Sequence, residues 1–86
     1  GIRQLEKTAS GKGTKFSEMI LSLDGRDYRL SDEADIYVKS VAGEYSMITA
    51  NALSDNLKQY SLTLYSDKQE SEGGRVRIII AVPIVK

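Results

Sequence analysis

Residues 19–30 have the sequence MILSLDGRDYRL, and this stretch decides the fold class. Its apolar positions recur at every second residue: Met19, Leu21 and Leu23 before the Asp24-Gly25 pair, then Tyr28 and Leu30 after it. A period of two is typical of strands that bury one face, although Ile20 interrupts the polar side. An Asp-Gly pair between two such runs predicts a tight turn. We therefore expect a β-hairpin centred on Asp24-Gly25.

Strand-like alternation continues on both sides of this hairpin. Further strands are expected at 35–39, 45–48, 60–65 and 75–82, together with a first strand within 2–9 that pairs late in the fold. Between them we expect a flexible connection at 10–13, a tight turn at 31–34, a loop at 40–44 and a charged connection at 67–74.

One segment, 49–59, has a helical pattern. Leu53 and Leu57 are four residues apart and would share a helix face, and Thr49 is a suitable N-cap. Alternatively, Ser54 begins a single helical turn inside an irregular loop. Short strands at regular spacing with one such insertion predict a mainly β fold, either a small five- to seven-stranded barrel or a compact sandwich with one short helix.

Length and composition limit the classes of function. We expect residues 1–86 to form a single small β domain excised from a longer protein, since the chain starts at Gly1 and has no signal-like segment. Twelve basic and twelve acidic residues cancel, which disfavours nucleic acid as a partner. The chain has no Cys and no His, so Ser-His and Cys-His catalysis and thiolate metal sites are excluded within it. No apolar run is long enough to span a bilayer.

The closing segment 75–82 is the strongest strand and the expected contact surface. Val76, Ile78, Ile80 and Val82 are predicted to share the buried face, which leaves Ile79 on the outer side. Such near-continuous apolarity indicates either a strand that is covered on both faces or a strand whose outer face meets a partner. Arg75 and Arg77 make a basic edge, either for protection or for a ligand carboxylate or phosphate.

Two tyrosines complete the candidate interaction surface. Tyr37 and Tyr65 are expected to face outward from their strands, where an aromatic ring stacks on a peptide or sugar or simply covers a sheet edge. The predicted surface therefore consists of Tyr37, Tyr65, Arg75, Arg77 and Ile79.

Other motifs favour no catalytic, cofactor or metal site. The acidic residues Asp24, Asp27, Asp32, Glu33 and Asp35 are dense, but their spacing does not fit a calcium loop. The segment 11–15, GKGTK, is similar to a phosphate loop only in part, because it opens a strand and not a helix.

The run LDGRDYRLSDEADIYV, residues 23–38, resembles small β-barrel modules of secreted Gram-positive proteins. Such modules occur among clostridial and bacillar cell-surface proteins, often beside S-layer homology repeats. Their shared pattern is Asp-Gly-x-x-Tyr-x-Leu-Ser followed by a short turn and an Ile/Val-Tyr-Val strand. The resemblance covers roughly residues 16–81 and implies a barrel with no associated catalytic residues.

We therefore expect a non-catalytic structural or interaction module of a bacterial cell-surface or secreted protein, extracellular or in the envelope, with a cytoplasmic location as the alternative. Its partners would be neighbouring domains or another protein. Two other functions stay open: a barrel that binds an oligosaccharide or oligonucleotide on its sheet face, and a subunit of a symmetric homo-oligomer.

Overall fold

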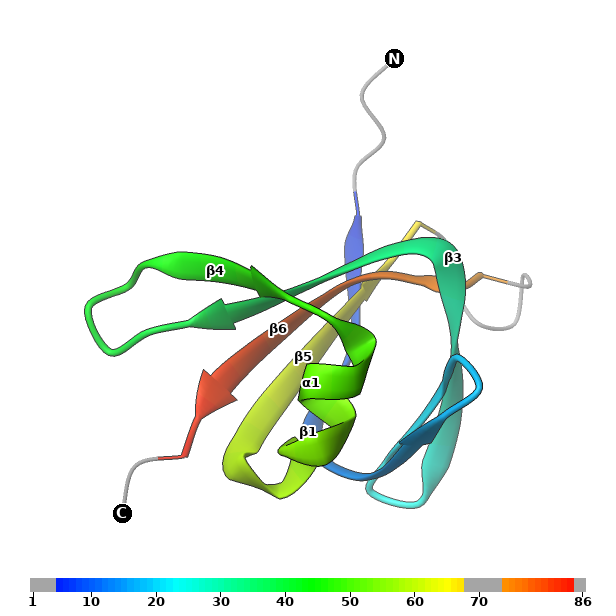
Figure 1. The fold of residues 1–86 in the computed structure, drawn as a ribbon. Helices are drawn as coiled ribbons and strands as arrows, with labels where there is room; N and C mark the ends of the chain where they lie inside the picture. Colours follow the sequence, from blue (N-terminus) through cyan, green and yellow to red (C-terminus); the bar gives the residue numbers. More distant parts are fainter. Residues whose placement is uncertain (1–4, 68–73, 85–86) are drawn as a thin grey trace.

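The computed structural model describes residues 5–67 and 74–84. In this part the chain forms six strands, one α-helix and one 3₁₀-helix (Figure 1). The elements are β1 (Glu6–Ser17), β2 (Ile20–Leu23), β3 (Arg26–Lys39), β4 (Tyr45–Ile48), α1 (Ala50–Asp55), η1 (Leu57–Gln59), β5 (Tyr60–Ser66) and β6 (Val76–Pro83).

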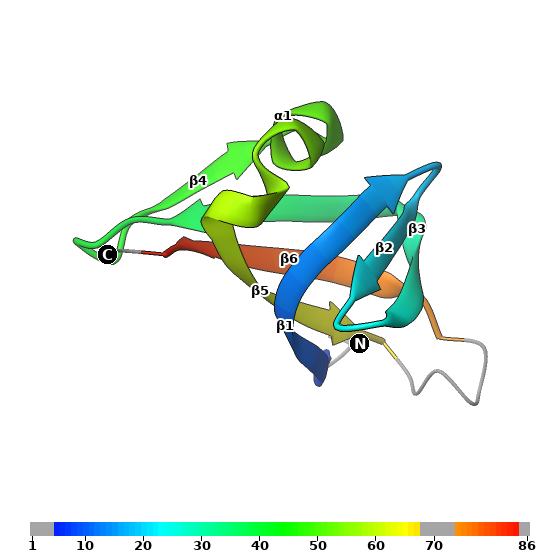
Figure 2. The same cartoon turned by 90° about the horizontal axis from the view of Figure 1, so that it is seen from below.

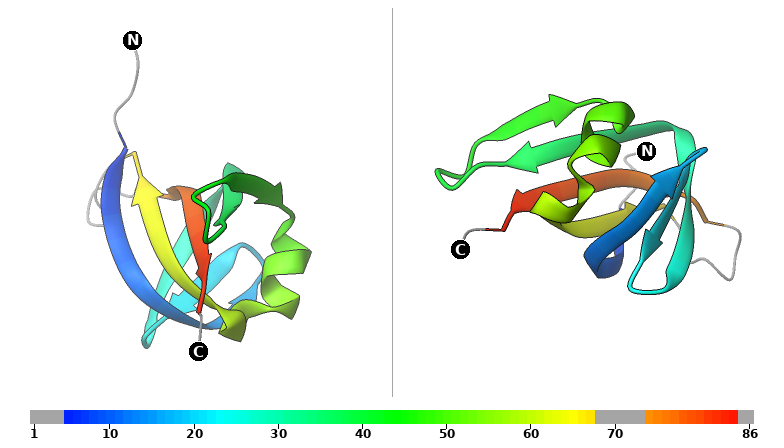
Figure 3. Two further views of the ribbon diagram at one scale, coloured as in Figure 1. Left: turned by 90° about the vertical axis from the view of Figure 1, so that its left-hand side faces the viewer. Right: turned by 60° about the horizontal axis from the view of Figure 1, so that its bottom comes forward.

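Five of these strands close into a barrel. The strand order is β2-β1-β5-β6-β3, and pairing between β2 and β3 completes the ring (Figure 2). The β3–β6 pair is parallel and the other pairs are antiparallel. β4 lies outside the ring, paired only with β3, so the β3–β4 hairpin extends away from the barrel (Figure 3). The predictions of a mainly β fold, a small barrel and one short helix are confirmed, and the sandwich alternative is not.

Two long strands make closure possible because each belongs to two parts of the barrel. β1 pairs with β5 along 6–12 and with β2 along 13–17. β3 pairs with β2 along 26–29 and then with β6, with a register shift between Leu30 and Asp35. The predicted turn at 31–34 is therefore wrong: the chain bends there within a continuous strand, and the Ser31 hydroxyl accepts a hydrogen bond from the Glu33 amide at 3.2 Å.

The Asp24-Gly25 hairpin is confirmed. Both residues have positive φ, 49° and 88°, which is the geometry of a type I′ turn, and Leu23 pairs directly with Arg26. A second tight turn at Glu18 and Met19 was not predicted, because it also has positive φ at both central residues, 51° and 63°, yet contains neither Gly nor Asn.

Replacing Gly25 by alanine is expected to lower the free energy of unfolding by about 1–2 kcal/mol, because a Cβ atom is unfavourable at positive φ. No atom lies within 4 Å of the added Cβ, so the cost is conformational and not steric. Urea titration followed by circular dichroism measures it. A stabilised Gly25→Ala variant would contradict the turn geometry.

The helical prediction at 49–59 is confirmed in part: α1 ends at Asp55, and η1 follows after Asn56. The Thr49 hydroxyl accepts a hydrogen bond from the Ala52 amide at 3.1 Å and so caps α1, as expected. Leu53 and Leu57 are both buried in the barrel core. The core also contains Phe16, Leu21, Leu23, Tyr28, Leu30, Ile36, Leu62, Leu64, Val76, Ile79 and Ala81.

Gly13 allows the helices to approach β1. A Cβ atom at this position would lie 2.7 Å from Leu57 Cδ1 and 3.0 Å from Leu62 Cδ1. The segment 10–13 is therefore not the flexible connection that the sequence suggested: it belongs to β1, and its glycine leaves space for two core side chains.

The predicted facing of β6 is correct for Val76, which is buried, and wrong for the residues after Arg77. Ile79 and Ala81 have no exposed surface, whereas Ile78 and Ile80 are half-buried on the outer side and Val82 is 41% exposed. Opposite β5, Ser66 pairs with Val76 and Tyr65 with Ile78, so Arg77 is an extra residue. A β-bulge of this kind reverses the alternation for all residues that follow it.

Candidate functional site

The outer face of the sheet carries a contiguous group of apolar side chains. Residues paired directly across neighbouring strands lie on the same face, so the register gives the arrangement. Tyr65 lies opposite Ile78, while Ile80 lies opposite Tyr37, which in turn lies opposite Met47. We call this surface the outer patch, with the members Tyr37, Tyr45, Met47, Tyr65, Ile78, Ile80 and Val82.

The outer patch spans four strands and is most open at β4. Met47 is 61% exposed and Tyr45 is 57% exposed. Tyr37, Tyr65 and Ile80, on the neighbouring strands β3, β5 and β6, are half-buried. Single exposed apolar residues are common on proteins, whereas a contiguous exposed apolar group on one face is less usual and is typical of contact surfaces. Its composition of tyrosine, methionine and branched aliphatic residues is that of interface centres.

Lysine side chains border the outer patch. Lys7 lies opposite Tyr65 and Lys39 lies opposite Tyr45, on the same face as their partners. The Lys39 ammonium nitrogen is 5.8 Å from the centroid of the Tyr45 ring, a cation–π distance. Asp35, opposite Ile78, is an acidic residue on this border. The patch thus has an apolar centre and a charged rim.

The structure brings together two of the five predicted surface residues and separates the others. Tyr37 and Tyr65 lie on the same face, on the two strands that flank β6. Ile79 lies in the core, so its predicted role as an outer contact is wrong, and Ile78 and Ile80 take that place. Sequence reasoning missed Met47 and Tyr45, although both alternate with Ser46 in the expected short strand.

Arg75 and Arg77 lie at a different place, a groove of about 590 Å³ beside the bend of β3. Its lining residues are Glu18, Met19, Arg29, Leu30, Ser31, Asp32, Glu33, Arg75 and Arg77. Three arginines face three carboxylates there, so the charges of the lining cancel and do not favour an anionic ligand.

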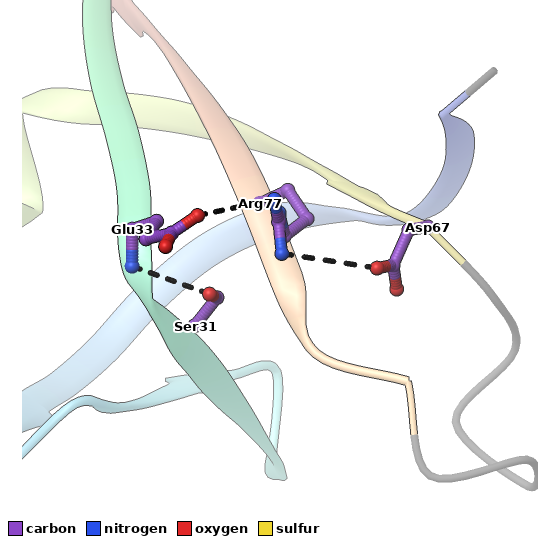
Figure 4. Close-up of polar contacts among 4 residues, drawn as sticks. All are labelled: Ser31, Glu33, Asp67 and Arg77. Carbon is purple, nitrogen blue, oxygen red and sulfur yellow. Dashed lines mark hydrogen bonds and ion pairs between the residues drawn. The ribbon is translucent and has the colours of Figure 1, made fainter. Parts of the chain in front are cut away.

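Arg77 forms ion pairs with residues on two other parts of the chain. Its guanidinium lies 3.5 Å from a Glu33 carboxylate oxygen and 3.9 Å from one of Asp67 (Figure 4). These contacts connect the bend of β3 with the end of β5 across the β-bulge of β6. Glu70 and Glu72, two acidic residues of the charged connection predicted at 67–74, lie outside the described residues.

Replacing Arg77 by glutamine is expected to lower the free energy of unfolding by less than about 1 kcal/mol, because both ion pairs are long and the arginine side chain is 37% exposed. Urea titrations at low and high salt measure the loss, which should shrink at high salt as the ion pairs are screened. A loss of several kcal/mol would instead show that the ion pairs hold the bend in place.

The acidic residues that were dense in sequence are dispersed in space. Glu33 contacts Arg77, and the Asp27 carboxylate accepts a hydrogen bond from the Ser22 hydroxyl on β2. Among residues 5–67 and 74–84, no group of three His, Cys, Asp or Glu side chains is placed to hold a metal ion. Within the same residues no helix has the length and apolarity needed to cross a bilayer.

The outer face of β1, β2 and β3 differs from the outer patch. The register places Lys15, Ser22 and Asp27 in one row and Ile20 opposite Arg29 in another. None of these paired residues is aromatic, and Tyr28 points into the core. This face therefore offers no ring for stacking.

Searches with the chain against protein-family models, curated proteins and solved structures found no match.

Proposed function

We propose that the protein is a non-catalytic interaction module that binds another protein, or a neighbouring domain of a longer chain, through the outer patch. The observation that carries this proposal is the register of β5, β6, β3 and β4, which places tyrosine, methionine and aliphatic side chains side by side on one face.

The energetics of the outer patch favour a protein partner. Burying apolar area contributes roughly 25 cal/mol per Å², so covering Met47, Tyr45 and Val82 supplies several kcal/mol before the costs of association. The half-buried tyrosines add contact area at low entropic cost because each has only two side-chain torsions. Lysines at the rim stay in water and favour a partner with acidic residues around its own apolar contact.

The absence of His and Cys from the sequence supports a role without catalysis. The likeness of residues 23–38 to modules of Gram-positive surface proteins supports a place in a bacterial envelope or secreted protein. We propose this location together with the binding role.

Photocrosslinking tests the binding role. Benzoylphenylalanine placed at Tyr65 should capture a partner in an extract of the source cells, and mass spectrometry then identifies it. The purified partner should bind the wild-type chain in calorimetry and lose at least about tenfold in affinity with Ile80→Lys, because the charge lies at the centre of the outer patch.

The matched control is Ile20→Lys, which changes the same residue type on the outer face of β2 and should leave the affinity unchanged. Equal losses with both variants, or no adduct from Tyr65, would contradict the proposal.

The strand order favours a second candidate. A five-stranded ring with one parallel pair and a helix before the fourth ring strand is the arrangement of OB-like barrels, which bind oligonucleotides and oligosaccharides over the second and third strands. In this protein the outward residues where β2 pairs with β3 include no aromatic residue, and the net charge is zero.

We therefore expect single-stranded DNA to bind more weakly than about 10⁻⁴ M even at low salt, because neither charge nor stacking favours it. Fluorescence anisotropy with a labelled oligothymidine measures this. Saturable, salt-sensitive binding at micromolar protein would favour the oligonucleotide role over the protein-binding role.

A further inference from the structure

β4 has the free edge of the described sheet. The other five strands each pair on both sides within the ring, whereas β4 pairs only with β3 (Figure 1). A free edge presents unpaired amide and carbonyl groups to any strand that comes alongside.

The hairpin geometry identifies which groups are free. The Ser40 amide donates to the Glu44 carbonyl at 2.8 Å, which makes this a hydrogen-bonded pair. Such pairs alternate along an antiparallel ladder, so Ser46 and Ile48 turn their backbone groups toward β3. Tyr45 and Met47 therefore direct their N–H and C=O groups toward the open edge.

This edge is short, with four residues, but it lacks the other usual protections against pairing. The strand sequence, Tyr-Ser-Met-Ile, contains no charged residue and no proline, and its register with β3 has no bulge. Native edge strands usually carry lysine, proline or a bulge to prevent association. The side chains of Tyr45 and Met47 are also more than half exposed.

We propose that two copies of the chain pair antiparallel through their β4 edges, with Ser46 on the twofold axis. In this register Tyr45 lies opposite Met47 of the second copy, and the two equivalent pairs use all the outward backbone groups of β4 in four hydrogen bonds. The two barrels then share one continuous sheet.

Neighbouring registers are less favourable because they need backbone groups that are already used. An axis at Tyr45 would bring in Gly43, whose amide donates to the Ser40 carbonyl at 2.9 Å. An axis at Met47 would bring in Thr49, whose carbonyl accepts from the Leu53 amide at 3.1 Å. The register with its axis at Ser46 needs neither group.

Side chains and charge also fit a second copy. Each Tyr45 ring meets a methionine sulfur across the axis, a favourable contact, and the two Ser46 hydroxyls face each other. The strand is uncharged, and the net charge of zero produces no long-range repulsion. The two Lys39 side chains would be separated by three strand spacings, about 14 Å, beyond the screening length at physiological salt.

The contact is small, so the dimer is expected to be weak. A four-residue edge with two exposed apolar side chains covers much less than the roughly 800 Å² per partner of a stable interface. We expect a Kd of roughly 0.1–1 mM, with a light-scattering mass that rises toward the dimer as concentration increases. Pairing would also join the two outer patches into one larger face.

Disulfide trapping tests the register, and the chain suits it because it contains no cysteine. In the proposed dimer, cysteines at Ser46 lie directly opposite each other, within reach of a disulfide. Cysteines at Glu44 would be about 13 Å apart along the strands and cannot bridge. We expect Ser46→Cys to form a covalent dimer under mild oxidation at least about tenfold faster than Glu44→Cys.

A double variant, Ser46→Cys with Met47→Lys, checks that pairing of the β4 edges causes the disulfide to form. The lysine should slow dimer formation to the rate of Glu44→Cys. The circular dichroism spectrum should remain that of the folded protein. Equal rates for Ser46→Cys and Glu44→Cys, or a wild-type mass that stays monomeric at millimolar concentration, would overturn the proposal. Neither outcome depends on the photocrosslinked partner, because both are measured with the purified chain alone.

Discussion

Replacing Ile79 by lysine is expected to leave the protein unfolded at room temperature. Ile79 has no exposed surface and lies in register between Ile36 of β3 and Leu64 of β5. An ammonium group at this position has no carboxylate beside it in the core, and an unpaired buried charge costs several kcal/mol. A domain of this length has a free energy of unfolding of roughly 4–13 kcal/mol. Circular dichroism and a urea titration at neutral pH measure the loss.

The neighbouring variant Ile80→Lys is the matched control. Ile80 is half-buried on the outer face, where the lysine stem covers the sheet and its ammonium reaches water. This variant should stay folded, with a loss of about 1 kcal/mol. If Ile80→Lys unfolded the protein and Ile79→Lys did not, the facing expected from the sequence alternation would be correct and the β-bulge at Arg77 would be wrong.

Replacing Gly13 by valine is expected to lower the free energy of unfolding by about 3 kcal/mol. The first added carbon alone would lie 2.7 Å from Leu57 Cδ1 and 2.9 Å from Leu57 Cγ, so η1 has to move away from β1. The two further methyl groups of valine enlarge the overlap. Urea titration gives the free energy, and hydrogen exchange should show that the protection lost is greatest in α1 and η1.

Two further variants serve as controls for Gly13→Val. Thr14→Val changes the next residue, which is exposed, and should alter stability by less than about 0.5 kcal/mol. Gly13→Ala separates the steric overlap from the change in backbone flexibility. With no overlap, alanine in a strand would stabilise the protein by roughly 0.5–1 kcal/mol relative to glycine. A stabilised Gly13→Ala variant would show that the space between β1 and η1 is not tight.

Features that depend on local chemistry could be predicted from the sequence. The Asp24-Gly25 turn follows from two residues that tolerate positive φ, and the α1 cap follows from the Thr49 hydroxyl. Alternation along 60–65 correctly placed Leu62 and Leu64 inside, because β5 has no bulge in this range. In each case the residues that determine the structure are close together in the chain.

Features that depend on distant partners could not be predicted in this way. The β-bulge at Arg77 exists because β5 and β6 pair with unequal spacing, and it moves Ile79 from the outer face to the core. Gly11 and Gly13 are typical of a flexible linker, yet β1 continues through them because β5 and β2 pair on either side. Ser31 and Asp32 indicate a turn, but β3 only bends there, because it pairs with β2 before the bend and with β6 on both sides of it.

The residues of the candidate surface were predicted only where inward and outward side chains alternate without a bulge. Tyr37 and Tyr65 were correctly expected on the outer side, and both are half-buried there. Met47 and Tyr45 were missed because their exposure follows from the position of β4 outside the ring, which depends on strand order and not on the sequence of β4.

The position of β6 has a consequence for how the chain is made. Of the six described strands, β6 is synthesised last, yet it lies between β5 and β3 and closes the ring through its parallel pair with β3. Until β6 emerges, the nascent polypeptide exposes two unpaired edges and the apolar interior behind them, both of which favour aggregation. We therefore expect cotranslational folding of this domain to be all-or-none: a ribosome-bound chain that ends before residue 75 should be protease-sensitive, and a chain extended far enough for β6 to leave the ribosome should contain the resistant barrel.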